Sequence, residues 1–131
     1  MHIRHRFVFW IFVYLYCFLI FFYSSNPSPG TSLGTRHLVV AYSSYLHLLE
    51  YLILSFLVYL ASYYTHLFRK YSILSTFLFV ALFAISDEVH QLFVPGRYFS
   101  YIDMGVDTFS SVLFFAVRYV TKNYEPRKKS S

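Results

Sequence analysis

The sequence has little charge for its length. Only 13% of its 131 residues are charged, whereas a soluble domain usually carries about 25%. Hydrophobic residues make up 57% of the chain, and 16 Phe and 14 Tyr supply a large part of them. A surface of this composition would not stay dispersed in water. An ordinary soluble protein is therefore excluded, and a lipid bilayer is the expected surrounding.

The chain is also short of cysteine, glycine and proline. Cys17 is the single cysteine, so an internal disulfide is impossible and cysteine usage does not indicate a redox compartment. Two of the four Pro and two of the four Gly lie between residues 27 and 34, which predicts an irregular loop there. A second Pro-Gly pair predicts a tight turn over Val94–Arg97.

Four apolar runs are long enough for membrane-spanning helices, since roughly 20 residues are needed to cross a hydrocarbon core of about 30 Å. They cover residues 7–23, 42–64, 71–94 and 101–120. The sequence therefore predicts an all-α, polytopic membrane protein with about four transmembrane helices in one small bundle. No internal repeat or second domain is evident, so residues 1–131 are expected to form a single domain with a basic tail over 121–131.

The run over residues 7–23 has a second interpretation as a signal peptide, because Arg4 and Arg6 precede it. A signal peptide ends in a cleavage site of small residues, and Ser24–Pro27 matches that pattern poorly. The run is also long for the apolar part of a signal peptide. We therefore expect a retained helix.

Lys and Arg are distributed unevenly between the ends of the apolar runs. Nine of the eleven lie at the N-terminus, in the second connection or near the C-terminus. These nine are Arg4, Arg6, Arg69, Lys70, Arg118, Lys122, Arg127, Lys128 and Lys129. The other connections hold only Arg36 and Arg97. Cytoplasmic loops are enriched in Lys and Arg, so we expect a multi-pass cell-membrane protein with both termini in the cytoplasm.

The net charge of +5 would also fit a nucleic-acid-binding protein. Such proteins gather their Lys and Arg residues in a patch or stripe on one face. In this chain the basic residues lie at the ends of apolar runs instead. We therefore expect lipid as the main partner and no nucleic acid, while the oligomeric state stays open.

Five of the six acidic residues lie within the apolar runs or at their ends. They are Glu50, Asp87, Glu88, Asp103 and Asp107. An ionisable group at the centre of a membrane costs about 2.5–3.5 kcal/mol on insertion scales. Such residues rarely occur there without a partner or a function.

The polar residues of three helices are expected to lie at one depth. At 1.5 Å per residue, Asp87 lies about 24 Å from the cytoplasmic start of its helix and His90 about 28 Å. Glu50 lies about 22 Å from the cytoplasmic end of its helix and His47 about 27 Å. Asp103 lies in the first turn of the last helix. This common level is just inside the non-cytoplasmic leaflet.

Each of these helices also gathers its polar residues on one face, because residues three or four positions apart are neighbours on a helix. The sets are His47 with Glu50, Asp87 with His90 and Gln91, and Asp103 with Asp107. Taken singly, each set has a structural interpretation as a hydrogen-bonded or rim group. If the three sets had unrelated structural roles, they would not be expected to lie in the same leaflet. Their joint position therefore predicts a small aqueous pocket.

The stretch Ser86–Arg97, which reads SDEVHQLFVPGR, resembles the signature of the VanZ-like membrane protein family. That family typically carries S-D-E-x-H-Q, an apolar stretch, P-x-R or P-G-R, and then an Asp that opens the last helix. Asp103, six residues after Arg97, corresponds to that Asp. Asp107 stands where family members usually have Asn, and Ser110 stands where they have Gly. The first difference adds an acid to the site.

The resemblance implies a role in the cell envelope. Named members of the family confer low-level resistance to teicoplanin-type glycopeptides. We therefore expect the pocket to bind a lipid-linked or surface ligand. The residues expected to contact it are His47, Glu50, Asp87, Gln91, Arg97 and Asp107. Among these, Arg97 would offer a two-pronged donor to a phosphate or carboxylate.

Two other hypotheses remain open from the sequence. In the first, the chain is a membrane hydrolase or transferase in which Glu88, His90 and Asp103 are catalytic, with a carboxylate as general base. A divalent metal is possible in that case but not required, because no H-E-x-x-H or similar closed metal pattern occurs. In the second, the chain is a small non-catalytic transporter or assembly subunit, since membrane acids with His can relay protons.

Overall fold

The computed structural model describes residues 2–26, 36–66, 68–97 and 99–124. Within them the chain forms four α-helices and no strand, so the all-α prediction is confirmed for these residues. The elements are α1 (His2–Ser24), α2 (Arg36–Tyr64), a 3-10 helix η1 (Arg69–Tyr71), α3 (Ser72–Gln91) and α4 (Tyr101–Tyr124). The predicted irregular loop over residues 27–34, the side chains of Arg4, Arg6 and Arg36, and the tail from residue 125 lie outside the described part.

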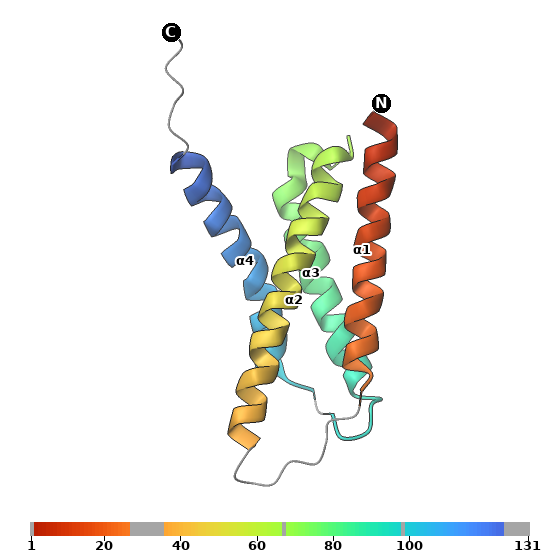
Figure 1. The fold of residues 1–131 in the computed structure, drawn as a ribbon, viewed down its shortest axis with the longest axis vertical. Helices are drawn as coiled ribbons and strands as arrows, with labels where there is room; N and C mark the ends of the chain where they lie inside the picture. Colours follow the sequence, from red (N-terminus) through yellow and green to blue (C-terminus); the bar gives the residue numbers. More distant parts are fainter. Residues whose placement is uncertain (1, 27–35, 67, 98, 125–131) are drawn as a thin grey trace.

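The four helices run alternately up and down, so that α1 begins and α4 ends at the same end of the bundle (Figure 1). Helix α2 packs against α1, α3 and α4 and is the central element. The second half of α4 leans away from α2 and α3 (Figure 1). This divergence separates the second half of α4 from the other helices.

The helix ends differ from the apolar runs for local reasons. Helix α3 ends at Gln91 and not at Val94, because Pro95 cannot donate an amide hydrogen bond and disfavours helical backbone in the residue before it. Helices α2 and α4 extend beyond their apolar runs, to Arg36 and to Tyr124. Polar residues form helix as readily as apolar ones, so hydropathy alone misses such ends.

The predicted turn over Val94–Arg97 is present. The Arg97 amide donates to the Val94 carbonyl over 3.1 Å, and Gly96 has a φ of 80°. Proline at the second position and a positive-φ glycine at the third position are typical of a type II turn. The turn sends the chain back toward the bundle and thereby places Arg97 at its edge.

The hydrophobic core lies between α1, α2 and α3. It consists of Val13, Ile20, Tyr51, Leu54, Val58, Ala61, Val80 and Ala84. Ala61 and Ala84 are fully buried, as is Ser55. Small residues at these positions let helix backbones approach closely, which is how helices associate in a membrane.

The outer surface is apolar around most of the bundle. Phe18, Leu82 and Ile102 are 68%, 67% and 75% exposed, and many other large apolar side chains face outward with them. Three described segments are long and apolar enough to cross a membrane: Phe7–Ser24, Tyr45–Tyr64 and Arg69–Gln91. Helix α4 is more polar, with four charged residues in 24. These features are those of a membrane protein.

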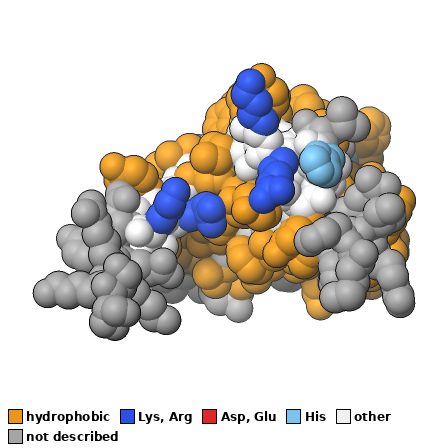
Figure 2. All heavy atoms as spheres, turned by 90° about the horizontal axis from the view of Figure 1, so that it is seen from above, with side chains coloured by type: hydrophobic (Ala, Val, Ile, Leu, Met, Phe, Trp, Pro, Cys, Tyr) orange, Lys and Arg blue, Asp and Glu red, His pale blue; other side chains and the backbone are white. Residues whose placement is uncertain are grey.

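One end of the bundle carries Lys and Arg side chains, and no acidic side chain is visible on it (Figure 2). The described side chains that form this basic end are Arg69, Lys70, Arg118 and Lys122. Three of these cations lie over tyrosine rings, the closest being Arg118, whose guanidinium carbon is 4.3 Å from the centroid of Tyr59. A cation over an aromatic face is attracted to its electrons, so these tyrosines help to hold the charges at the surface.

Candidate functional site

The polar residues expected from the sequence gather at the opposite end, which we call the polar end. Here α1 and α3 finish and α4 begins (Figure 1). The buried polar side chains at this end are Ser24, His47, Asp87, Glu88, Gln91 and Asp107. They come from all four helices.

His47 of α2 is paired with Asp107 of α4. Its Nδ1 atom lies 3.2 Å from Oδ1 and 3.3 Å from Oδ2 of the carboxylate, with the hydrogen bond to Oδ2. Asp107 is fully buried and His47 is 6% exposed. One turn further along α2, the ring of Tyr51 lies nearly parallel to the imidazole. The pair joins α2 to α4 and holds the imidazole in one orientation.

Asp87 of α3 is bound from two directions. The Ser24 hydroxyl donates to its Oδ2 atom over 3.0 Å, and the Gln91 amide donates to the same oxygen over 3.1 Å. Asp87 is fully buried, and Ser24 is the last residue of α1. This carboxyl therefore attaches the end of α1 to α3.

Glu88 of α3 binds the start of α4. Its Oε2 atom accepts the Ser100 amide over 2.8 Å, and the Ser100 hydroxyl accepts the Asp103 amide over 3.1 Å. Ser100 thus caps the helix, with an acidic residue three positions later, as in a capping box. In this case the backbone N–H of the capping residue Ser100 donates to Glu88, which belongs to another helix, α3. Glu88 is accordingly an anchor for the first turn of α4.

His90 of α3 faces the end of α1. Its Nε2 atom lies 2.8 Å from the Ser25 hydroxyl oxygen, and that hydroxyl also donates to the Phe21 carbonyl over 2.7 Å. A serine hydroxyl has a single proton. When that proton goes to Phe21, the imidazole must donate to Ser25. The contact then ties α1 to α3 and does not activate Ser25 as a nucleophile.

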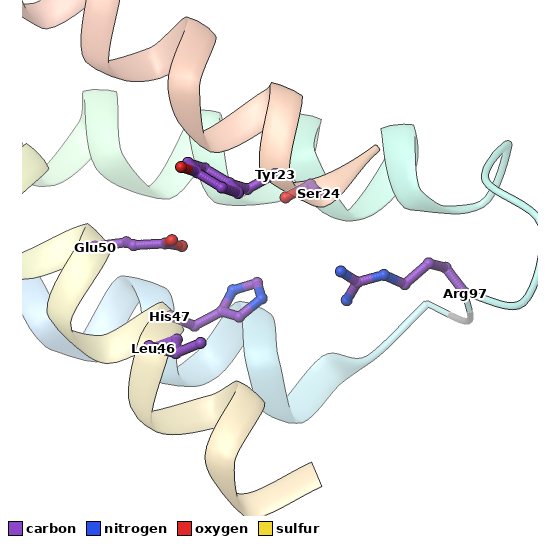
Figure 3. A pocket seen from close by; sticks show the side chains of 6 residues that line it. All are labelled: Tyr23, Ser24, Leu46, His47, Glu50 and Arg97. Atoms are coloured by element: carbon purple, nitrogen blue, oxygen red, sulfur yellow. The ribbon is translucent and has the colours of Figure 1, made fainter. Parts of the chain in front are cut away.

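Arg97 follows the turn after α3 and points back toward α1 and α2 (Figure 3). Its Nε atom donates to the Asn26 carbonyl over 3.4 Å. Asn26 itself donates from its amide side chain to the carbonyls of Phe22 and Tyr23, which closes the last turn of α1. The guanidinium is thereby held beside the end of α1, with its terminal nitrogens directed into the space between the helices.

That space is a pocket of about 180 Å³. Its lining side chains are Tyr23 and Ser24 of α1, Leu46, His47 and Glu50 of α2, and Arg97 (Figure 3). Three of the nine residues expected in the site line it, namely His47, Glu50 and Arg97. The pocket therefore combines a cation, a carboxyl and an imidazole from two elements.

The other six expected residues do not line this pocket. Asp107 supports His47 from behind, and Asp87, Glu88 and His90 make the contacts to other parts of the bundle described above. Gln91 holds the Asp87 carboxyl within α3. Asp103 is half-buried in the first turn of α4. These residues build the end of the bundle in which the pocket lies.

Sequence reasoning missed the contribution of α1. Tyr23, Ser24, Ser25 and Asn26 each contact or line the polar end. The signal was a polar run directly after 17 apolar residues, which places hydroxyl and amide groups at the same end of the bundle as the acids. Their positions were visible in the sequence, but the contacts of Ser24 with Asp87 and of Ser25 with His90 were not.

Some buried polar atoms have no hydrogen-bond partner among the described residues. They include the Tyr51 hydroxyl, Oδ1 of Asp87 and Oε1 of Glu88. A buried polar atom without a partner costs free energy. Any of these atoms that stays without a partner lowers the stability of the polar end.

The described residues contain no group of three or more His, Cys, Asp or Glu side chains placed to hold a metal ion. The carboxyls of the polar end are each engaged with a different neighbour or face a different space. Zinc sites in proteins need at least three converging ligands. The geometry of these side chains thus offers no metal-binding set in the described part of the chain.

A family model, VanZ/LLP1, matches residues 7–122. The chain belongs to the VanZ/LLP1 family. No curated protein and no solved structure matches the chain. The family assignment covers all four helices and agrees with the membrane character of their surfaces.

In this VanZ/LLP1 protein, the stretch Ser86–Arg97 has a clear structural use. Its first acid, Asp87, binds α1, and its second, Glu88, binds the start of α4. Its last residue, Arg97, reaches the pocket. The two differences from the family pattern also have partners, since Asp107 pairs with His47 and the Ser110 hydroxyl donates to the Asp107 carbonyl.

Proposed function

We propose that this VanZ-like membrane protein binds the phosphate- or carboxylate-bearing head group of an envelope ligand in the pocket at its polar end. The observation that carries the proposal is the guanidinium of Arg97, which faces the pocket. No ion pair links it to a carboxylate of the described residues. An arginine so placed is a two-pronged donor for phosphate or carboxylate oxygens.

The size of the pocket favours a head group over a whole antibiotic. Pockets that enclose drug-sized ligands usually measure about 300–1,000 Å³. The pocket measures about 180 Å³ and opens between helices whose outer faces are apolar. A lipid could leave its chains against those faces while its head group enters. A resistance-type role would then act through an envelope lipid and not through capture of a glycopeptide.

In this proposal α4 is a fourth membrane span and the polar end faces away from the cytoplasm. The support is the basic end, since Lys and Arg favour the cytoplasmic side. The four charged residues of α4 lie in its first two turns and in its last two turns. Asp107 faces the interior and Arg118 lies over Tyr59, so neither charge needs to face the lipid core.

Cysteine labelling tests this orientation. In a Cys17→Ser background, Phe93→Cys at the polar end should react with a membrane-impermeant maleimide applied to intact cells. Lys122→Cys at the basic end should react only after the membrane is opened. Phe93 is 81% exposed, and Lys122 is exposed, so both thiols are accessible from their own side. The reverse labelling pattern would show that the termini are not cytoplasmic.

The function itself is tested by removing the cation. In a host made more tolerant of teicoplanin-type glycopeptides by expression of the chain, Arg97→Gln should abolish this increase in tolerance. Loss of one charged hydrogen bond to a ligand weakens binding by about tenfold or more. Arg69→Gln, which removes a cation at the basic end, is the matched control and should keep the gain. Equal tolerance in the two variants at equal membrane levels would rule out the proposal.

A membrane hydrolase or transferase finds less support in the geometry. Glu88 and His90 bind neighbouring helices, and the Ser25 hydroxyl is committed to a backbone carbonyl. A proton-relaying transporter would need a polar path toward the basic end. In that half of the bundle, Ser55 and Thr76 donate their hydroxyls to carbonyls of their own helices.

A further inference from the structure

Glu50 is the one acid of the polar end that lines the pocket. It lies on α2 one turn after His47, and its carboxyl extends into the space between α1 and α2 (Figure 3). The residue is half-buried, and no hydrogen bond or ion pair joins its carboxyl to a described residue. The fully buried acids differ from it, because Asp87, Glu88 and Asp107 each have a partner outside their own helix.

The pocket is thus lined by two side chains of opposite charge type that form no ion pair with each other among the described residues. Arg97 reaches it from the turn after α3, and Glu50 reaches it from α2. Neither takes part in a described ion pair, and the imidazole of His47 is committed to Asp107. A half-buried ionisable group without an ion-pair partner is costly, so the retention of both favours a ligand that brings a counter-charge to each.

We propose that the pocket is selective for a zwitterionic head group, with Arg97 binding its phosphate and Glu50 binding its ammonium group. This inference rests on the proposed binding of a head group through Arg97. A phosphate alone would place a negative charge in the same small cavity as Glu50, and that repulsion discriminates against purely anionic ligands. A phosphate joined to an ethylammonium group meets a complementary charge at both positions.

The surroundings of Glu50 suit an ammonium ion. Tyr23 of α1 contributes an aromatic side chain to the same pocket, and an ammonium group is attracted to an aromatic face. Leu46 supplies an apolar side chain to the wall of the pocket. The Ser24 hydroxyl is occupied by Asp87 and does not compete for the ligand.

Binding of short-chain lipids to the full-length protein tests the selectivity. The protein is purified in dodecyl maltoside, and affinities are measured by microscale thermophoresis below the micelle-forming concentration of each lipid. Dihexanoyl-phosphatidylethanolamine and dihexanoyl-phosphatidylglycerol carry the same phosphodiester, but only the first has an ammonium group. Water-soluble glycerophosphoethanolamine has that head group without acyl chains. Tighter binding of the short-chain lipid would identify a lipid as the source of the ligand, and equal binding would identify a soluble compound.

The wild-type protein should bind the ethanolamine lipid about tenfold more tightly than the glycerol lipid, the effect of one charge-assisted hydrogen bond. Glu50→Gln keeps the size of the side chain and should remove the preference without weakening the binding of the glycerol lipid. Arg97→Gln should weaken the binding of both lipids, and Arg69→Gln should weaken the binding of neither.

Two different failures can be told apart. Equal affinities of the wild-type protein for the two lipids, or an unchanged preference in Glu50→Gln, would overturn the zwitterion selectivity. Binding that still depends on Arg97 would in that case leave the proposed head-group function standing. Absence of binding of either lipid to the wild-type protein would overturn both.

Discussion

Replacing His47 with Ala is expected to lower the free energy of unfolding by about 3–5 kcal/mol, because it leaves the carboxyl of Asp107 buried without its ion pair. Asp107 is fully buried and contacts the His47 imidazole at 3.2 Å. Asp107→Ala should cost less, about 1–3 kcal/mol, since an imidazole left alone can lose its proton and become neutral. Unfolding in mixed micelles with increasing dodecyl sulfate, followed by far-UV circular dichroism, measures both changes.

Apolar replacement of both partners separates the pair from general packing. His47→Leu combined with Asp107→Leu should recover most of the lost stability, because well-packed apolar residues often replace a buried ion pair without cost. Val112→Ala is the control on the same helix, since this side chain is 47% exposed and should change stability by less than about 0.5 kcal/mol. A double variant as unstable as His47→Ala would mean that the ion pair is not the cause.

Tyr51 is expected to give opposite results for two substitutions. Tyr51→Ala should lower the free energy of unfolding by about 3–5 kcal/mol, because it leaves a cavity in the core. The ring is fully buried and contacts His47 and Phe83. Tyr51→Phe should raise stability by about 1 kcal/mol, because it removes a buried hydroxyl without a partner among the described residues. The same unfolding measurement reports both variants.

The outcome for Tyr51→Phe is the more informative of the two. A loss of more than 1 kcal/mol would mean that the hydroxyl has a partner, such as a bound water molecule among the buried acids. A gain in the free energy of unfolding would support the view that the polar end retains groups which stability alone does not favour. Groups of that kind are often kept for binding or catalysis, and Glu50 and Arg97, which form no described ion pair, fit the same interpretation.

The number and positions of the helices could be predicted because each apolar run is long and interrupted only by clustered polar residues. The exact ends could not, since α2 and α4 extend into polar sequence and α3 stops before Pro95. Helix formation depends on backbone hydrogen bonds and on proline as well as on hydropathy. The predicted and observed helices therefore differ only at their ends, where the apolar pattern carries no information.

The gathering of the polar residues at one level along the bundle could also be predicted from the sequence, because rise per residue is the same in every helix. Spacing within one helix placed His47 and Glu50 on neighbouring parts of one surface. It did not show that one would pair with Asp107, 60 residues away, and that the other would face Arg97. The pairing of His47 with Asp107 and the position of Glu50 both depend on how α2 is rotated about its axis relative to its neighbours. That rotation follows from the packing of the whole core.

The sequence by itself determined that this is a small helical membrane protein of the VanZ-like type with polar residues gathered toward one end. The features that determined it are the hydropathy, the positions of Lys and Arg, and the acids within the apolar runs. These are local properties, since the tendency of a segment to leave water depends on its own side chains. Tertiary structure decided which acids became ties between helices and which one was left facing a cavity. That outcome depends on contacts between residues far apart in the chain, such as Ser24 with Asp87 and Glu88 with Ser100.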